Sequence, residues 1–156
     1  MVESGSERGK RPTFAAENKE QKRMNDERPR KPLTRAETEV MNILWDSPQA
    51  LTVREIVERY LEPLPAVTTV GTFLRILEAK GYVEHRRKAG STGRTFVYMP
   101  TMTREKYLAI VMGEVRDSLF SRSAKKLCSY FIEHEDLSDE DLMEIMALIE
   151  QQKEHL

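Results

Sequence analysis

Four polar side chains that could read DNA fall on one side of a helical pattern over residues 68–81. They are Thr68, Thr69, Thr72 and Arg75. An apolar stripe lies opposite, made of Val70, Phe73, Leu74 and Leu77. Threonine hydroxyls suit phosphates and base edges, and an arginine can fork onto guanine. Gly71 lies in the same surface, where it would let DNA come close at some cost in helix propensity. A solvated threonine-rich face is the alternative interpretation.

A group of cations follows this segment. Two short runs rich in Tyr, Val, Phe and Thr flank residues 88–93, which predicts a β-hairpin with a mobile tip that contains two glycines. The cations around this tip are Arg86, Arg87, Lys88 and Arg94. Such a hairpin would meet phosphates, whereas a solvated basic turn is the alternative.

Three helices are needed to position the polar face and the hairpin. Thr34 with Glu37, and Thr52 with Glu55, have the spacing of capping boxes, and Gly81 suits the position after a helix end. The first helix, about 34–46, is expected to bury Leu33, Val40, Ile43 and Leu44, and the second Val53, Ile56, Val57 and Tyr60. Three helices followed by a hairpin is the order of a winged helix, whose third helix enters the major groove.

The apolar residues of 101–156 have helical spacing throughout, which predicts three helices. Breaks are expected at 122–123 and 135–138, with Ser138 and Asp141 as a third capping pair. A region this small buries little surface alone, so we expect a homodimer. The apolar residues expected to dimerise are Leu108, Val111, Met112, Val115, Leu119, Leu127, Phe131, Leu142, Ile145 and Ile149.

The net charge differs between the same three segments that the hydrophobic patterns distinguish. The 156 residues carry a net charge of -1, which conceals +3 in residues 1–32, +1 in 33–100 and -5 in 101–156. We therefore expect a disordered basic arm, a winged-helix domain and a helical dimerisation domain over these ranges. The expected fold class is mainly α with a small β-hairpin. No apolar run approaches a membrane span and no secretory signal is present, so we expect a cytoplasmic protein.

An enzyme is not expected from this sequence. His85, His134 and His155 are scattered, and no phosphate loop, nucleophile elbow or HExxH motif occurs. We expect no metal and no cofactor. One cysteine excludes an internal disulfide and a multi-thiolate metal site, and Cys128 is expected to be a packed thiol. A redox-responsive repressor that acts through Cys128 is a weaker hypothesis.

Several separated motifs together resemble the penicillinase-repressor family (BlaI, MecI and copper-responsive CopY relatives). They are LTRAETEVMNILWDSPQALTVREIVERY, TTVGTFLRILEAKGYVEHRR, RTFVYMPTMTREKY, SLFSRSAKKL and FIEHEDLSDEDLMEI, over about residues 33–153. The resemblance implies a homodimeric repressor on a two-fold operator in double-stranded DNA. It also implies reading of the operator by the four polar residues of the third helix, with Arg54 and Arg94 as phosphate contacts.

Departures from the family pattern limit what the resemblance implies. β-Lactam-responsive members have a membrane sensor protease system and are cut at an Asn-Phe bond, where this chain has Tyr130 and Phe131. The missing Asn argues against release by cleavage. The cysteine cluster of copper-responsive members is absent, which excludes copper sensing by that route. Gly71 replaces an often basic or polar residue, so the operator sequence does not carry over.

The sequence thus favours a DNA-binding transcriptional repressor. The alternative is a winged helix used purely as a protein-interaction module, with the acidic C-terminal half on a partner. A steep fall of duplex binding with salt would distinguish the two, because only the repressor contacts phosphates.

Overall fold

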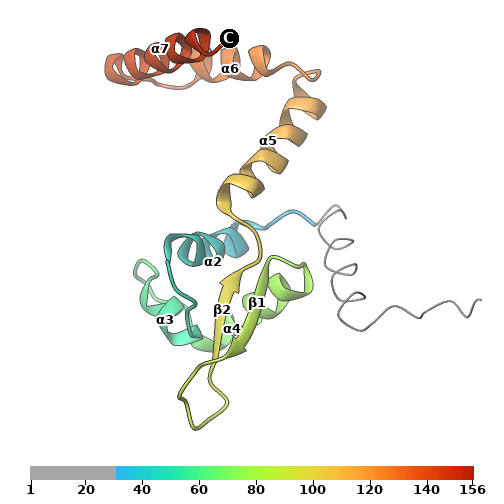
Figure 1. Ribbon diagram of the computed structural model, residues 1–156, viewed down its shortest axis with the longest axis vertical. Coiled ribbons are helices and arrows are strands. Elements are labelled where there is room, and N and C mark those ends of the chain that lie inside the picture. Colours follow the sequence, from blue (N-terminus) through green and yellow to red (C-terminus); the bar gives the residue numbers. More distant parts are fainter. Residues whose placement is uncertain (1–30) are drawn as a thin grey trace, which may run out of the picture. The chain divides into compact units, whose positions relative to one another are not determined.

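The structure, a computed structural model, describes residues 31–156 and divides after Thr103 into two compact units (Figure 1). The first unit ends at Thr103, and the second runs from Arg104 to Leu156. The expected disordered arm, residues 1–32, lies outside the described residues except for its last two positions. The described residues are mainly helical with one two-stranded hairpin, as the sequence predicts.

The described part of the first unit contains three helices, α2 (Arg35–Asp46), α3 (Val53–Glu58) and α4 (Val67–Ala79). Both predicted capping boxes are present. The Glu37 N–H donates to Thr34 Oγ1 over 3.3 Å, and the Glu37 carboxylate accepts from the Thr34 N–H over 3.1 Å. Thr52 and Glu55 repeat this exchange at α3. Each box satisfies two backbone groups that a helix start would otherwise leave unpaired.

Gly81 ends α4 as predicted and turns the chain into the hairpin. Its φ of +83° is a left-handed conformation that favours glycine. The Gly81 N–H donates to the Glu78 carbonyl over 3.0 Å, and the Tyr82 N–H donates to the Leu77 carbonyl over 2.9 Å. This pair of bonds is a Schellman motif. The chain therefore leaves the helix in a fixed direction, directly into the first strand.

The hairpin consists of β1 (Val83–Arg87) and β2 (Phe96–Pro100), which pair antiparallel with His85 opposite Tyr98 (Figure 1). One contact that the sequence did not reveal joins the hairpin to the helices. Leu51, just before α3, forms a β-bridge with Tyr98, whose carbonyl accepts from the Leu51 N–H over 3.0 Å. The second strand of the hairpin, β2, is thereby tied to the start of α3.

The hydrophobic core of the first unit lies between the three helices and the base of the hairpin. Its most buried residues are Val40, Met41, Leu44, Leu51, Ile56, Val70, Leu74, Leu77, Tyr82 and Val83. The sequence prediction was wrong in detail: Leu33, Ile43, Val53, Tyr60 and Phe73 are only half-buried, whereas Met41 is fully buried. Leu33 precedes α2, and Ile43 and Phe73 lie at the edges of the buried stripes of α2 and α4, where solvent still reaches them. Half-buried Trp45 donates its indole N–H to the Met102 carbonyl over 2.9 Å.

The second unit consists of α5 (Arg104–Leu119), α6 (Ala124–His134) and α7 (Asp139–Glu154). The three predicted helices and the Ser138 capping box are confirmed, and the first break begins two residues earlier than expected, after Leu119. None of these helices contains a buried residue. The second unit therefore has no core of its own.

Across the described residues 31–156, no helix is both long and apolar enough to span a membrane.

Candidate nucleic-acid interface

The structure brings the four predicted polar residues together on the outer surface of α4. Thr68, Thr69, Thr72 and Arg75 are exposed. Val70, Leu74 and Leu77 on the other side of the helix are fully buried. Because the buried stripe fixes the rotation of α4, it also fixes which residues face outward. We call the exposed set, Thr68, Thr69, Thr72 and Arg75, the reading face.

Two features of α4 decide how it can contact DNA, a committed hydroxyl hydrogen at Thr72 and an uncapped first turn. The Thr72 hydroxyl donates to the Thr68 carbonyl over 3.0 Å, so its hydrogen is already used within the helix. At the start of α4, Ala66 provides no side-chain cap, whereas Thr34, Thr52, Ser123 and Ser138 cap their helices. An uncapped helix start offers backbone N–H groups to a phosphate.

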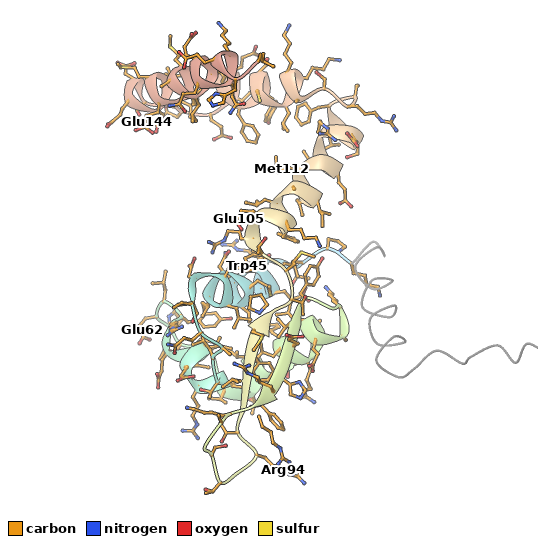
Figure 2. The ribbon with its side chains drawn as sticks, in the orientation of Figure 1. Trp45, Glu62, Arg94, Glu105, Met112 and Glu144 are labelled. Atoms are coloured by element: carbon orange, nitrogen blue, oxygen red, sulfur yellow. The ribbon has the colours of Figure 1, made fainter. Side chains whose placement is uncertain are left out.

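The hairpin carries the predicted cations on its exposed part, which we call the wing (residues 86–95). Arg86, Arg87, Lys88 and Arg94 are all exposed. The Lys88 N–H donates to the Thr95 carbonyl over 2.8 Å and closes the loop, in which Gly90 has a φ of +76°. Figure 2 shows Arg94 projecting from this loop. Arg86 and Arg87 are consecutive strand residues and therefore leave opposite faces of the hairpin.

Arg54, the second residue of α3, is exposed. The family resemblance implies that it contacts a phosphate. The neighbouring Glu55 is held by its capping box. Its pKa is lowered first by the hydrogen bond from the Thr52 N–H, then by the Thr52 hydroxyl, with a smaller effect of the positive charge on Lys88.

A contact between α4 and β1, the strand that leads into the wing, was missed by sequence reasoning. His85 Nδ1 on β1 lies 2.5 Å from Glu78 Oε1 on α4, and the imidazole packs edge-on against Phe96 with 5.0 Å between ring centroids. The two elements that are predicted to meet DNA therefore touch each other through side chains. Glu78 and His85 are seven residues apart on either side of a helix end, and no sequence pattern indicates that such residues pair.

A second missed contact fixes the other end of α4. Lys80 Nζ lies 2.7 Å from Glu37 Oε2 on α2 and also donates to the Pro32 carbonyl over 3.1 Å. Glu37 is the one charged residue buried among those described. Burial alone would raise the pKa of Glu37, but the hydrogen bond from Lys80, bonds from Thr34 and the charge on Lys80 together lower it. This ion pair joins α2 to the end of α4.

The predicted dimerisation residues are nowhere fully buried in the single chain. Leu108, Leu119, Phe131 and Ile149 are exposed, Leu119 by 74%. The remaining six are half-buried: Val111, Met112, Val115, Leu127, Leu142 and Ile145. Large side chains outside the prediction are exposed as well, among them Met143, Met146 and Leu148 on α7. The second unit thus presents many apolar side chains to solvent.

Three other sequence expectations fall in the second unit. Tyr130 and Phe131, the cleavage-site equivalent, lie inside α6 and are half exposed. The role of a sensor protease stays a prediction. Cys128 is exposed rather than packed, which corrects the expectation of a packed thiol, because α6 has no second layer to cover it.

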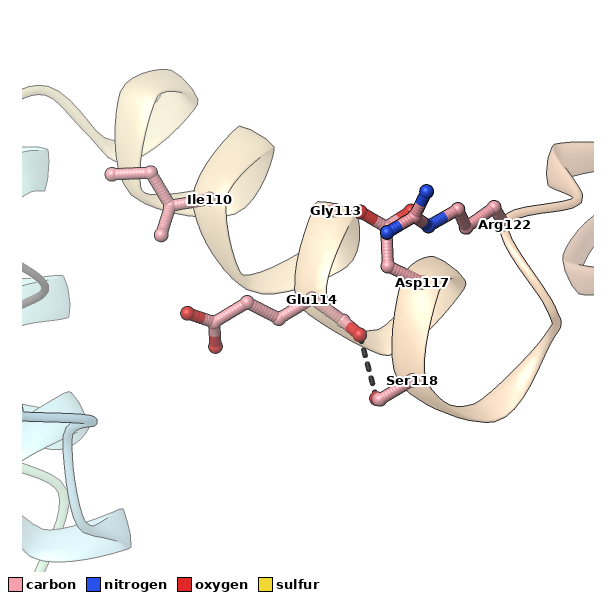
Figure 3. Close-up of a pocket in the computed structure, with 6 residues that line it drawn as sticks. All are labelled: Ile110, Gly113, Glu114, Asp117, Ser118 and Arg122. Atoms are coloured by element: carbon pink, nitrogen blue, oxygen red, sulfur yellow. Dashed lines mark hydrogen bonds between the residues drawn. The ribbon is translucent and has the colours of Figure 1, made fainter.

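An open groove of about 760 Å³ follows α5 (Figure 3). Its lining consists of Ile110, Gly113, Glu114, Asp117, Ser118 and Arg122. Arg122 has a φ of +61° in the turn after α5. Within residues 31–156, no group of three or more His, Cys, Asp or Glu side chains could hold a metal ion.

The family model described as penicillinase repressor matches residues 33–151. The chain belongs to the penicillinase repressor family. A penicillinase repressor from Bacillus licheniformis is 26% identical over 118 residues, which cover 76% of this chain and 89% of the relative. This membership confirms the predicted family and the predicted class of function, a DNA-binding transcriptional repressor.

Solved structures show similarity at lower identity. FabT of Streptococcus pneumoniae in complex with DNA is 16% identical, with a TM-score of 0.43 over 92% of this chain and 96% of FabT. The MepR–DNA complex of S. aureus is 20% identical, with a TM-score of 0.41 over 94% of this chain and 100% of MepR.

Proposed function

We propose that this penicillinase-repressor family member binds a two-fold operator as a homodimer and represses transcription by excluding the polymerase from this DNA. The reading face of α4 enters the major groove, and the wing contacts the phosphates beside it. The observation that carries this proposal is the placement of an exposed Thr/Arg face directly over a fully buried stripe, with a basic wing attached to the same helix. Rigid support on one side and polar groups on the other are what base reading requires.

The second unit supports the dimer. Its three helices bury no side chain and leave Leu119, Met143 and Met146 between 65% and 74% exposed. Apolar surface of this extent, unpaired in one chain, is expected to pack against another. A second copy of the same unit offers the same apolar surface, and a two-fold arrangement of this kind matches a two-fold operator.

The distribution of charge also supports separate roles for the two units. Residues 33–100 carry a net +1 and residues 101–156 carry -5. DNA phosphates attract the first group and repel the second. We therefore assign DNA contact to α3, α4 and the wing, and dimerisation to α5, α6 and α7.

Footprinting on the region upstream of the chain's own gene tests the proposal. We expect a protected segment with two half-sites about one helical turn apart, or a multiple of it. A lack of protection there and on neighbouring promoters at low salt would contradict it. Such a result would favour a winged helix that binds protein instead of DNA.

Replacement of two arginines should separate base reading from phosphate contact. Arg75→Ala is expected to weaken specific binding by about 1–3 kcal/mol and to relax sequence preference, because Arg75 lies on the reading face. Arg94→Ala is expected to weaken binding to all sequences alike. It should also reduce the slope of the logarithm of affinity against the logarithm of salt concentration by about one. Fluorescence anisotropy on specific and scrambled duplexes measures both. Equal losses on the two duplexes for both variants would refute this assignment.

A further inference from the structure

Gly71 occupies a costly position in α4. It lies five residues into a 13-residue helix, where glycine is less favourable than alanine because it loses more backbone freedom on folding. Glycine within a helix therefore calls for a specific reason. Two reasons are common: a left-handed backbone conformation, or a neighbour so close that no side chain fits.

Neither reason holds for Gly71. The glycines with positive φ in the described chain are Gly81 and Gly90, and Gly71 is not among them. A Cβ atom added at Gly71 would meet nothing within 4 Å. The fold of the single chain therefore has no need of glycine here, and alanine would fit without any shift of its neighbours.

Gly71 lies within the reading face. Helical spacing of three and four residues places it beside Thr68 and Arg75, and Thr72 follows it directly. These longer side chains surround a point where the backbone of α4 is bare. At this point a molecule that approaches the helix can come nearer than anywhere else on the reading face.

Two apolar surfaces lie at the bare point, between the polar groups of Thr68 and Arg75. The Thr72 hydroxyl donates to the Thr68 carbonyl over 3.0 Å and can only accept a further hydrogen bond, so the first apolar surface is the Thr72 methyl group. The Gly71 Cα adds a second apolar surface. On the major-groove edge of DNA, the one apolar group is the C5 methyl of thymine.

We propose that Gly71 is a specificity-determining residue, at which the C5 methyl of an operator thymine packs against the bare backbone of α4. The proposal rests on the proposed function, because it requires α4 in the major groove. Glycine is kept at the expense of helix stability because a Cβ would occupy the place of the thymine methyl. Stability and operator affinity should then respond to Gly71→Ala in opposite directions.

The experiment begins with selection of a consensus duplex from a randomised library by the wild-type protein. Gly71→Ala is expected to bind this duplex about ten-fold more weakly, or worse, and a scrambled duplex within about two-fold of wild type. Its Tm should rise by a few degrees, because a helix glycine is removed. Thr38→Ala on α2 is the control: it replaces a poorer helix former by alanine outside the reading face, the wing and the second unit, so we expect a rise in Tm with unchanged Kd.

Uracil substitution identifies the DNA group. Each consensus thymine is replaced in turn by deoxyuridine, which lacks only the C5 methyl. We expect one thymine per half-site at which this change weakens wild-type binding several-fold but leaves Gly71→Ala unaffected. An equal effect of uracil on both proteins at every position would overturn the assignment to thymine.

The remaining outcomes are also decisive. Wild-type affinity of Gly71→Ala for the consensus duplex would overturn this inference alone. A lower Tm of Gly71→Ala would overturn it as well, since the fold would then need the glycine. If the wild-type protein selected no consensus at all, the proposed function would fail together with the inference.

Discussion

Ile149→Asp is expected to separate the two chains of the proposed dimer. Ile149 lies on α7 with 48% of its surface exposed in the single chain, among side chains that the second copy would cover. A carboxylate placed in an apolar interface loses its hydration without gaining a partner, at a cost of several kcal/mol. Two-fold symmetry introduces the change twice. We expect the dimer Kd to rise by at least about 100-fold, as measured by sedimentation velocity.

Gln151→Asp provides the matched control for this change. Gln151 is an exposed polar residue two positions further along α7, on the side of the helix away from Ile149, so the variant adds the same charge outside the apolar face. It should remain dimeric. Ile149→Asp should also lose most of its operator affinity, because a single winged helix holds only one half-site. Sedimentation as a dimer at micromolar concentration would show that the α7 surface around Ile149 is not the interface.

Lys80→Met is expected to destabilise the first unit by about 3 kcal/mol. Lys80 is the cation paired with buried Glu37 over 2.7 Å, and its removal leaves a buried carboxylate without its counter-charge. Urea unfolding followed by Trp45 fluorescence reports on this unit, because Trp45 is the one tryptophan of the chain. Lys153→Met removes the exposed 3.3 Å pair with Glu150 in the second unit and should cost at most about 1 kcal/mol, measured by circular dichroism because Trp45 lies in the first unit.

The double variant Glu37→Gln with Lys80→Met separates loss of charge pairing from loss of packing. With both charges gone, no buried charge is left unpaired, so the double variant should be less destabilised than the sum of the two single variants. Additive losses would mean that the pair contributes no coupling. In that case α2 and the end of α4 are held together by their apolar contacts alone.

Glu37 should also make stability depend on pH. Its pKa in the folded chain is lowered from the usual 4.5, so folding is favoured by the ionised form. The resulting stabilisation is fully present above about pH 4.5 and is lost as the pH falls through the lowered pKa of the folded state. Glu55 and Asp141 have lowered pKa values too, and the difference between wild type and Glu37→Gln isolates the Glu37 contribution. That difference should shrink with acidification, measured from Trp45 fluorescence in urea; a constant difference down to pH 3 would contradict it.

Local signals explain which parts of the fold the sequence predicted well. Three capping boxes, a glycine at a helix end and runs of β-branched residues act over three or four positions and can be recognised without tertiary information. The helices, the hairpin and the reading face of α4 all follow from such signals. The helical period that buries Val70, Leu74 and Leu77 also turns Thr68 and Arg75 outward.

The features that were missed depend on contacts between distant residues. Glu37 has the sequence signature of a capping residue, and nothing near it indicates that Lys80, 43 positions later, lies against it. The bridge from Leu51 to Tyr98 likewise joins segments on either side of α3 and α4. Cys128 was expected to be packed because its apolar neighbours suggest a core. A unit that lacks a core of its own leaves such a residue exposed.

Titration of the wild-type protein against its selected duplex and a scrambled duplex, over a range of salt concentrations, tests sequence-specific DNA binding most directly. The account predicts a preference of about 1,000-fold or more for the selected duplex. It also predicts that the logarithm of affinity falls steeply with the logarithm of salt concentration, because the wing and α3 release phosphate counterions. Equal affinity for both duplexes, or binding that does not change with salt, would contradict it.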